Sequence, residues 1–244
     1  MFNKTEIKYL IYTSLILGFI FSFREWGTEE FSPIIGTTNW LLYILIFVFS
    51  IAIHALTQKI IAKKLGASST LIIWKAKQLW FTRGSRLKRA IPLGYILSLF
   101  LSFYSFGYIK FTGVFGAEIK QTLPKLKKKF PKLDDYEQGL IALSGSLANL
   151  ILAFIFAILA SLINIELSRL IAVNISLAIF TMLPFPSLNG IQVLFGSRVL
   201  YVMSLVFIII SYFLINSGSI LLTILSSLII AIIIGLIYFY NLNK

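Results

Sequence analysis

The residues with the clearest chemical potential lie in the apolar stretch from Trp40 to Gly66, at His54 and Gln58. Their i,i+4 spacing places both side chains on one face of a helix. In the helical metal-binding pattern H-E-x-x-H, imidazoles at these two positions hold zinc, and the glutamate acts as general base. Here Ala55 follows His54, and Gln58 offers a neutral amide. The segment therefore has the spacing of a metal site but only one of its three functional side chains.

The composition indicates that the helix carrying these residues lies in a membrane. The chain has 244 residues, of which 58% are hydrophobic, and a mean hydropathy of +0.91. Soluble domains are about 45–50% apolar, and the excess here falls in runs of the roughly 17–25 residues that cross a bilayer. We therefore predict an all-α polytopic membrane protein, with residues 1–244 as a single integral membrane domain. It has about six transmembrane helices, at residues 8–23, 40–65, 139–163, 168–186, 197–215 and 219–240.

The net charge of +13 could suggest nucleic acid, but its distribution fits membrane topology better. Basic residues mark cytoplasmic loops. With the N-terminus in the cytoplasm, Arg24 and Arg169 fall outside, and the other 20 of the 22 basic residues fall inside with both termini. The pattern predicts a multi-pass protein of the cell membrane whose partner is lipid and not nucleic acid. Because the chain has no cysteine, it forms no disulfides and performs no thiol catalysis.

Residues 59–138 form a basic insertion after the second predicted helix. We predict a cytoplasmic or re-entrant segment with a small membrane-associated β element. Its strands fall at 69–74 and 78–82, around a turn at Lys75–Lys77, with a third candidate at 110–116. The apolar segment 91–108 lies between two basic flanks, so a crossing would place one flank outside, and we predict a re-entrant helix. The basic linker 123–131 is expected to contact anionic headgroups.

Two further motifs follow the histidine segment in order. Residues 144–149 read S-G-S-L-A-N, and residues 183–190 read L-P-F-P-S-L-N-G. Taken with residues 54–66, they resemble the site-2 protease family of intramembrane zinc metalloproteases, in particular its small archaeal and sporulation-type branch. The resemblance covers about residues 40–200. The positions that match the family are His54, Ala62, Lys63, Lys64, Gly66, Gly145, Asn149, Asn174, Ala178, Leu183, Pro184, Pro186, Leu188 and Gly190.

The departures from the family pattern fall on its chemistry. Ser146 replaces a proline, and Thr181 replaces an asparagine. The three zinc-ligand positions implied by the resemblance hold His54, Gln58 and Asn189. The general-base position holds Ala55.

Zinc prefers imidazole, thiolate and carboxylate ligands, and neutral amides supply neither charge nor basicity. We therefore expect no catalytic residues and no metal, although zinc is the cofactor of active members. General acid–base catalysis alone contributes about 10²–10⁴-fold. The chain has no second histidine, and the nine acidic residues lie outside the predicted spans. Glu118 is the least remote of them as a substitute base.

The remaining motif residues have a second interpretation as packing and interhelical contacts. The resemblance gives Asn149, Asn174, Gly145 and Gly190 substrate-binding or structural roles. Amides such as these form hydrogen bonds between membrane helices, worth about 0.6 kcal/mol on average. Small residues at 144–148 allow close helix approach. A retained polar contact between helices is therefore expected at the former ligand positions.

Three functions remain open. The first is an inactive family member that binds transmembrane segments of other proteins, as a regulator or chaperone, or that serves as a subunit of a larger membrane complex. The second is an active intramembrane metalloendopeptidase with atypical ligands. The third is a transporter or channel, which the near absence of intramembrane charge and of paired repeats disfavours.

Overall fold

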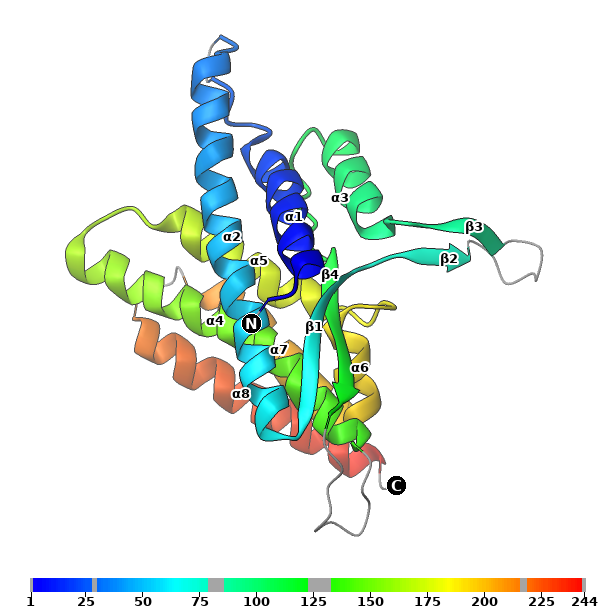
Figure 1. Cartoon of the computed structure of the whole chain (residues 1–244). Coiled ribbons are helices and arrows are strands. Elements are labelled where there is room, and N and C mark those ends of the chain that lie inside the picture. The colour runs from blue at the N-terminus through cyan, green and yellow to red at the C-terminus, as the bar shows by residue number, and fades with distance from the viewer. Residues whose placement is uncertain (1, 28–29, 79–85, 123–132, 216–218, 243–244) are drawn as a thin grey trace.

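The computed structural model describes all residues except 1, 28–29, 79–85, 123–132, 216–218 and 243–244 (Figure 1). The described part is mainly helical, with four short strands between the second and fourth helices. In chain order the elements are α1 (Lys4–Ser22), α2 (Pro33–Lys64), β1 (Ala67–Ile73), β2 (Ala76–Gln78), β3 (Arg86–Ile91), α3 (Leu93–Tyr104), β4 (Phe115–Gln121), α4 (Asp135–Ile163), α5 (Ser168–Thr181), α6 (Asn189–Gly196), α7 (Arg198–Leu214) and α8 (Ile220–Leu242).

The helices confirm a membrane protein but not the predicted number of spans. Among the described residues, α1, α2, α4 and α8 are long and apolar enough to cross a bilayer, whereas α5 and α7 are apolar but shorter. The span predicted at 168–186 was too long, because Pro184 and Pro186 cannot continue a helix and α5 ends at Thr181. At 14 residues, α5 is about 21 Å long, against a hydrocarbon core of about 30 Å.

The long helix α2 runs through the middle of the molecule (Figure 1), and His54 is one of its buried residues. It begins at the Ser32 cap with Pro33 as its first residue, and Lys63 and Lys64 sit in its last turn. Both end signals favour a helix, since proline has the right φ for the first turn and cations interact well with the C-terminal dipole. Its 32 residues span about 48 Å, more than a bilayer core, and it contacts α1, α4, α5 and β1.

The sheet differs from the predicted hairpin. β1 pairs antiparallel with β4, with Leu71 opposite Ala117, and β2 pairs with β3 in a separate two-stranded sheet. The expected turn at Lys75–Lys77 is wrong, because β2 already begins at Ala76. The third predicted strand, at 110–116, corresponds to β4, which starts at Phe115 and not at residue 110. Strand propensity marks residues that suit a sheet but does not choose their partner. Residues 79–82 and the linker 123–131 lie outside the described residues.

The predicted re-entrant segment contains a short helix. The 12 residues of α3 span about 18 Å, too little to cross a bilayer core. Pro92 caps its start, and Gly94 lies so close to Val114 that a Cβ would come within 2.9 Å of the Val114 backbone. Gly107, at φ +80°, turns the chain back after the helix. How deep α3 lies in a membrane stays a prediction.

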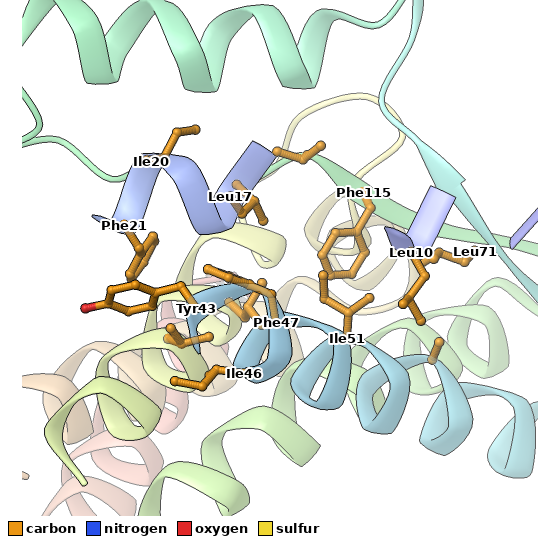
Figure 2. Close-up of a cluster of buried hydrophobic side chains, with 14 of the residues drawn as sticks. Leu10, Leu17, Ile20, Phe21, Tyr43, Ile46, Phe47, Ile51, Leu71 and Phe115 are labelled. Carbon is orange, nitrogen blue, oxygen red and sulfur yellow. The ribbon is translucent and has the colours of Figure 1, made fainter. Parts of the chain in front are cut away.

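A cluster of apolar side chains fixes α2 against α1 and β4 (Figure 2). Phe21 of α1 meets Phe47 of α2 edge-on at 5.0 Å between ring centroids, and Phe115 of β4 packs into the same cluster. Ala55 is buried in it as well. This packing sets the depth of α2 relative to β4, and it therefore places Phe115 beside His54.

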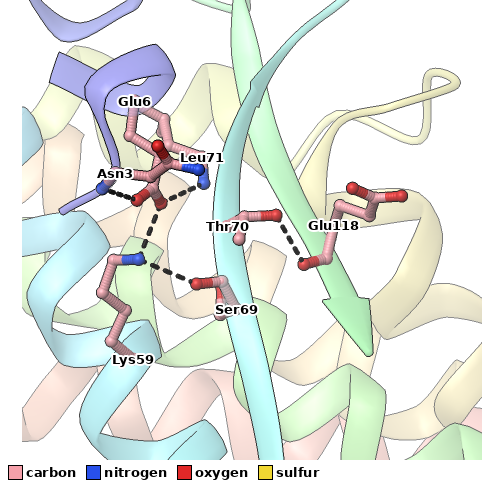
Figure 3. Close-up of polar contacts among 7 residues, drawn as sticks. All are labelled: Asn3, Glu6, Lys59, Ser69, Thr70, Leu71 and Glu118. Atoms are coloured by element: carbon pink, nitrogen blue, oxygen red, sulfur yellow. Dashed lines mark hydrogen bonds and ion pairs between the residues drawn. The ribbon is translucent and has the colours of Figure 1, made fainter. Parts of the chain in front are cut away.

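A buried ion pair fastens α1 and α2 to β1 (Figure 3). Glu6 is only 2% exposed, and its Oε1 accepts from Lys59 Nζ at 2.6 Å and from the Leu71 backbone N–H at 2.9 Å. Lys59 Nζ also donates to the Ser69 carbonyl at 3.0 Å. The expectation that every acidic residue lies outside the membrane helices was wrong here, because α1 begins at Lys4 and includes Glu6. The first turn of α1 is polar, so hydropathy alone did not include it in the predicted span.

Candidate functional site

The candidate site is centred on His54, whose side chain is fully buried between three elements. Phe115 of β4 contacts the imidazole edge-on, with ring centroids 5.2 Å apart. Gly145 of α4 lies against the other side, and a Cβ there would overlap the His54 ring. The glycine is therefore a steric requirement for α4 to approach α2 at this point.

Both ring nitrogens of His54 contact asparagine side chains. Nδ1 lies 3.1 Å from the amide of Asn149 on α4, and Nε2 lies 2.9 Å from Nδ2 of Asn189. Asn189 is the first residue of α6, which follows the proline-containing turn after α5. Gly190 permits this tight turn, because a Cβ there would overlap the Met182 carbonyl. The structure thus brings together four of the predicted site residues: His54, Gly145, Asn149 and Asn189.

The contacts of Asn189 fix the tautomer of His54. Oδ1 of Asn189 accepts from the Ala117 backbone N–H at 3.1 Å, so its N–H group faces His54 and Nε2 must be the acceptor. A neutral imidazole has one acceptor and one donor nitrogen, so Nδ1 carries the hydrogen. Asn149 must then present oxygen, which a 180° rotation of its amide achieves. The rotation gives the Asn149 oxygen a donor and moves its N–H₂ group to the buried position where the oxygen had no partner among the described residues.

Gln58 lies one helical turn from His54 but forms its described hydrogen bond elsewhere. Its Nε2 donates to the Ala142 carbonyl of α4 at 3.1 Å, and the side chain is buried. The amide therefore links α2 to α4 beside the imidazole. Two of the three mapped ligand positions, His54 and Gln58, share one face of α2. Of the other mapped positions, only Asn189, on α6, forms a described hydrogen bond with His54.

Two departures from the family pattern turn out to be partners. Ser146 of α4 and Thr181 of α5 share a hydrogen bond of 2.9 Å between their hydroxyl groups, and both are buried. Thr181 also donates to the Leu177 carbonyl. The sequence identified both positions as substitutions but not as a pair, because residues 35 apart give no periodic signal. The pair joins α4 to α5 next to the asparagine contacts.

Asn174 and Glu118 stay apart from the site. Asn174 Nδ2 bonds the Leu170 carbonyl within α5, and its Oδ1 is buried without a described partner. Glu118 follows Ala117 on β4, and alternate strand residues point to opposite faces. Its side chain is exposed and pairs with Lys120 at 3.0 Å. The least remote candidate for a replacement base therefore faces away from His54.

One curated protein resembles this chain over most of its length. It is named "Putative zinc metalloprotease MJ0611", from Methanocaldococcus jannaschii, and it is 30% identical over 200 residues, 79% of this chain and 85% of the relative. The chain belongs to this metalloprotease family. No family model matches the chain, and no solved structure does.

For a member of the metalloprotease family, the donor set around His54 does not fit zinc. The single lone pair of the neutral imidazole, on Nε2, already accepts the Asn189 N–H. The other two mapped positions hold neutral amides, which bind zinc poorly. Within the described residues, no three His, Cys, Asp or Glu side chains gather closely enough to hold a metal. Ala55 offers no atom that could accept a proton from a water molecule.

The outward backbone groups next to the site are also occupied. On β4, Ala117 bonds the Asn189 side chain through its N–H and the Gln192 side chain, at 2.6 Å, through its carbonyl. On the other edge of the sheet, Glu6 and Lys59 bond Leu71 and Ser69 of β1. Sequence reasoning missed Gln192, although its i,i+3 spacing from Asn189 on α6 places both on one helix face. Side chains thus satisfy backbone groups at both edges of the sheet.

Proposed function

We propose that this member of the metalloprotease family is a pseudoprotease of the site-2 type, a multi-pass protein of the cell membrane that binds transmembrane segments of other proteins without cleaving them. It acts alone or as a subunit of a larger membrane complex. Both termini lie in the cytoplasm, and the shorter α5 and α7 complete six spans. The observation that carries the proposal is the hydrogen bond from the Asn189 amide to Nε2 of His54.

This hydrogen bond supports inactivity because metal-dependent hydrolysis needs a free ligand and a base. A metal-bound water attacks a peptide carbonyl only after a base removes its proton. Here the imidazole lone pair is used by an amide donor, and the residue after His54 is alanine. The same side chains instead connect helices: His54 with Asn149 and Gln58 with Ala142 join α2 to α4. These side chains are therefore better suited to holding helices together than to hydrolysing a peptide bond.

The occupied sheet edges favour a particular binding mode. An extended peptide adds to a sheet through unpaired N–H and carbonyl groups of an edge strand. At Ala117, Leu71 and Ser69 these groups already bond side chains. A bound transmembrane segment would therefore remain helical, with its backbone bonds satisfied internally as the bilayer requires. Partner recognition then depends on apolar helix faces and not on strand addition.

An active metalloendopeptidase is the second candidate, because the Methanocaldococcus jannaschii relative carries the name of a zinc metalloprotease. The two candidates make opposite predictions for one reaction. In it, the purified full chain is reconstituted in liposomes with single-span reporter proteins that carry a tag at each end. The matched control protein is the variant His54→Ala.

The proposal predicts no cleaved reporter with the natural chain, while a photo-crosslinker in the reporter span still captures it intact. Capture by the His54→Ala protein as well would show that binding does not need the imidazole. Cleavage that disappears in His54→Ala would establish the second candidate. Failure to capture any reporter span would remove the binding role.

A further inference from the structure

A cation that the sequence analysis placed in the cytoplasm lies at the opposite end of α1. Lys110 Nζ donates to the Phe21 carbonyl at 3.2 Å and sits 4.9 Å from the centre of the Phe21 ring. Phe21 is next to the last residue of α1, and Lys4 is the first. Arg24 lies just beyond the same end, with its guanidinium 3.9 Å from the Tyr108 ring centre. The chain therefore places basic residues where the positive-inside rule disfavours them.

The nearby carboxylate does not account for this charge. Glu25 is already bonded to Arg169, at 2.8 Å, and to the Tyr43 hydroxyl, at 2.7 Å. Within the part of the chain that the structure describes, Lys110 forms no ion pair. Burial lowers the pKa of Lys110, and the more distant Glu25 carboxylate opposes this effect. An ammonium has three donors, so Lys110 retains hydrogen-bonding capacity for an anion after its bond to Phe21.

An apolar groove begins beside Lys110. A cavity of about 420 Å³ is lined by Phe21, Lys110 and residues of α5 and α7. A second cavity of about 380 Å³ shares Ala172, Ile175 and Tyr212 with the first. We call the two together the α5–α7 groove. In the first cavity, Lys110 is the charged residue among mainly apolar and aromatic neighbours. The second cavity also has Glu166 and Ser168 in its lining. The groove thus has a cationic end at Lys110, an apolar middle where the two cavities meet, and an acidic residue at its other end.

We propose that the α5–α7 groove binds an anionic phospholipid, with its phosphate at Lys110 and one acyl chain along α5 and α7. An apolar transmembrane helix suits this groove less well, because it would leave the Lys110 ammonium without a charged partner, whereas a phosphate would pair with it. An acyl chain is thin enough to follow the groove past Tyr212. Tyrosine side chains such as Tyr108 and Tyr212 suit this position, because one end of the ring is apolar and the hydroxyl is polar. The site is independent of the proposed pseudoprotease role.

The test compares phosphatidylglycerol with phosphatidylcholine of identical chains, by native mass spectrometry of the purified full chain. The site predicts retention of phosphatidylglycerol over phosphatidylcholine. Lys110→Gln should weaken phosphatidylglycerol binding about fivefold, and Lys110→Arg should preserve it. The matched control is Lys120→Gln, an exposed lysine on β4 that should change nothing. Ala172→Phe should fill the groove and reduce binding while leaving the charge intact.

Any of four results would overturn the site. Equal retention of both lipids, or no effect of Lys110→Gln, would indicate only general lipid contact. Retention of inorganic phosphate equal to that of phosphatidylglycerol would show that binding does not use the apolar groove. Displacement of phosphatidylglycerol by a hydrophobic helical peptide, with unchanged binding in Ala172→Phe, would assign the surface to protein. Where Lys110→Gln does not fold by circular dichroism, Ala172→Phe carries the test, because Ala172 is exposed.

Discussion

Asn189 donates its side-chain N–H to Nε2 of His54 across 2.9 Å, while its own oxygen accepts from the Ala117 backbone. Asn189, which the motifs lead us to propose as a former ligand position, therefore occupies the one lone pair that His54 could offer to a metal. The same amide connects α2, α6 and β4. We propose that these contacts stabilise the fold and do not support catalysis.

The tautomer of His54 is directly measurable, because it is the chain's one histidine. We expect ¹⁵N NMR of histidine-labelled protein to show a protonated Nδ1 and an unprotonated Nε2. In Asn189→Asp a carboxylate oxygen faces the ring in place of a donor, so the proton should move to Nε2 or the ring should become charged. A natural chain with its proton on Nε2 would contradict the assigned orientation of Asn189.

Removing the amides should lower the thermal stability of the folded protein in detergent. Asn189→Leu leaves both Nε2 of His54 and the Ala117 N–H without partners, and each buried orphan costs about 1–3 kcal/mol. Gln58→Leu should cost less, about 0.6 kcal/mol, since the Ala142 carbonyl lies within a helix. Thr38→Leu, at an exposed position of α2, is the control. Unchanged stability in the double variant Gln58→Leu, Asn189→Leu would reject a structural role for these two residues.

Gly145 and Gly139 both lie on α4, so changing each to alanine tests how closely α4 packs at the two positions. Alanine is the better helix former by about 1 kcal/mol, so Gly139→Ala should be close to neutral; its Cβ would meet the Gln192 carbonyl at 3.3 Å. Gly145→Ala would push its Cβ into the His54 ring, and we expect a loss of about 1–3 kcal/mol, typical of overpacking. Thermal unfolding of both variants measures the difference. Equal effects would show that α4 does not approach His54 this closely.

Local signals predicted the helices and the order of the motifs, but not the contacts between them. The 3.6-residue period placed His54 and Gln58 on one face, and hydropathy found the long helices. Both methods describe one segment at a time. The pairing of β1 with β4, the Ser146–Thr181 bond and the position of Lys110 at the far end of α1 each join residues distant in sequence. Such partners are chosen by packing, so no local pattern could reveal them.

The buried pair of Glu6 and Lys59 makes a further prediction. Lys59→Met leaves Glu6 with the Asn3 and Leu71 N–H donors, whereas Glu6→Gln leaves the half-buried Lys59 cation with the Ser69 carbonyl but without a carboxylate. We expect each single variant to lose about 1–3 kcal/mol, and the pair Glu6→Gln with Lys59→Met to lose less than their sum. Thermal unfolding of all four proteins gives this coupling energy. The exposed pair Glu118–Lys120 is the control, and additive losses at Glu6 and Lys59 would contradict a coupled pair.

The most direct test is the zinc content of the purified protein. We expect well below one zinc ion per natural chain, and near one per chain in the variant Gln58→His, Asn189→Asp, which places a charge and a second imidazole beside His54. This double variant omits Ala55→Glu, because a carboxylate at that position would enter the apolar cluster around Phe115. Stoichiometric zinc in the natural chain that is lost in His54→Ala would contradict the account and indicate a working metal site.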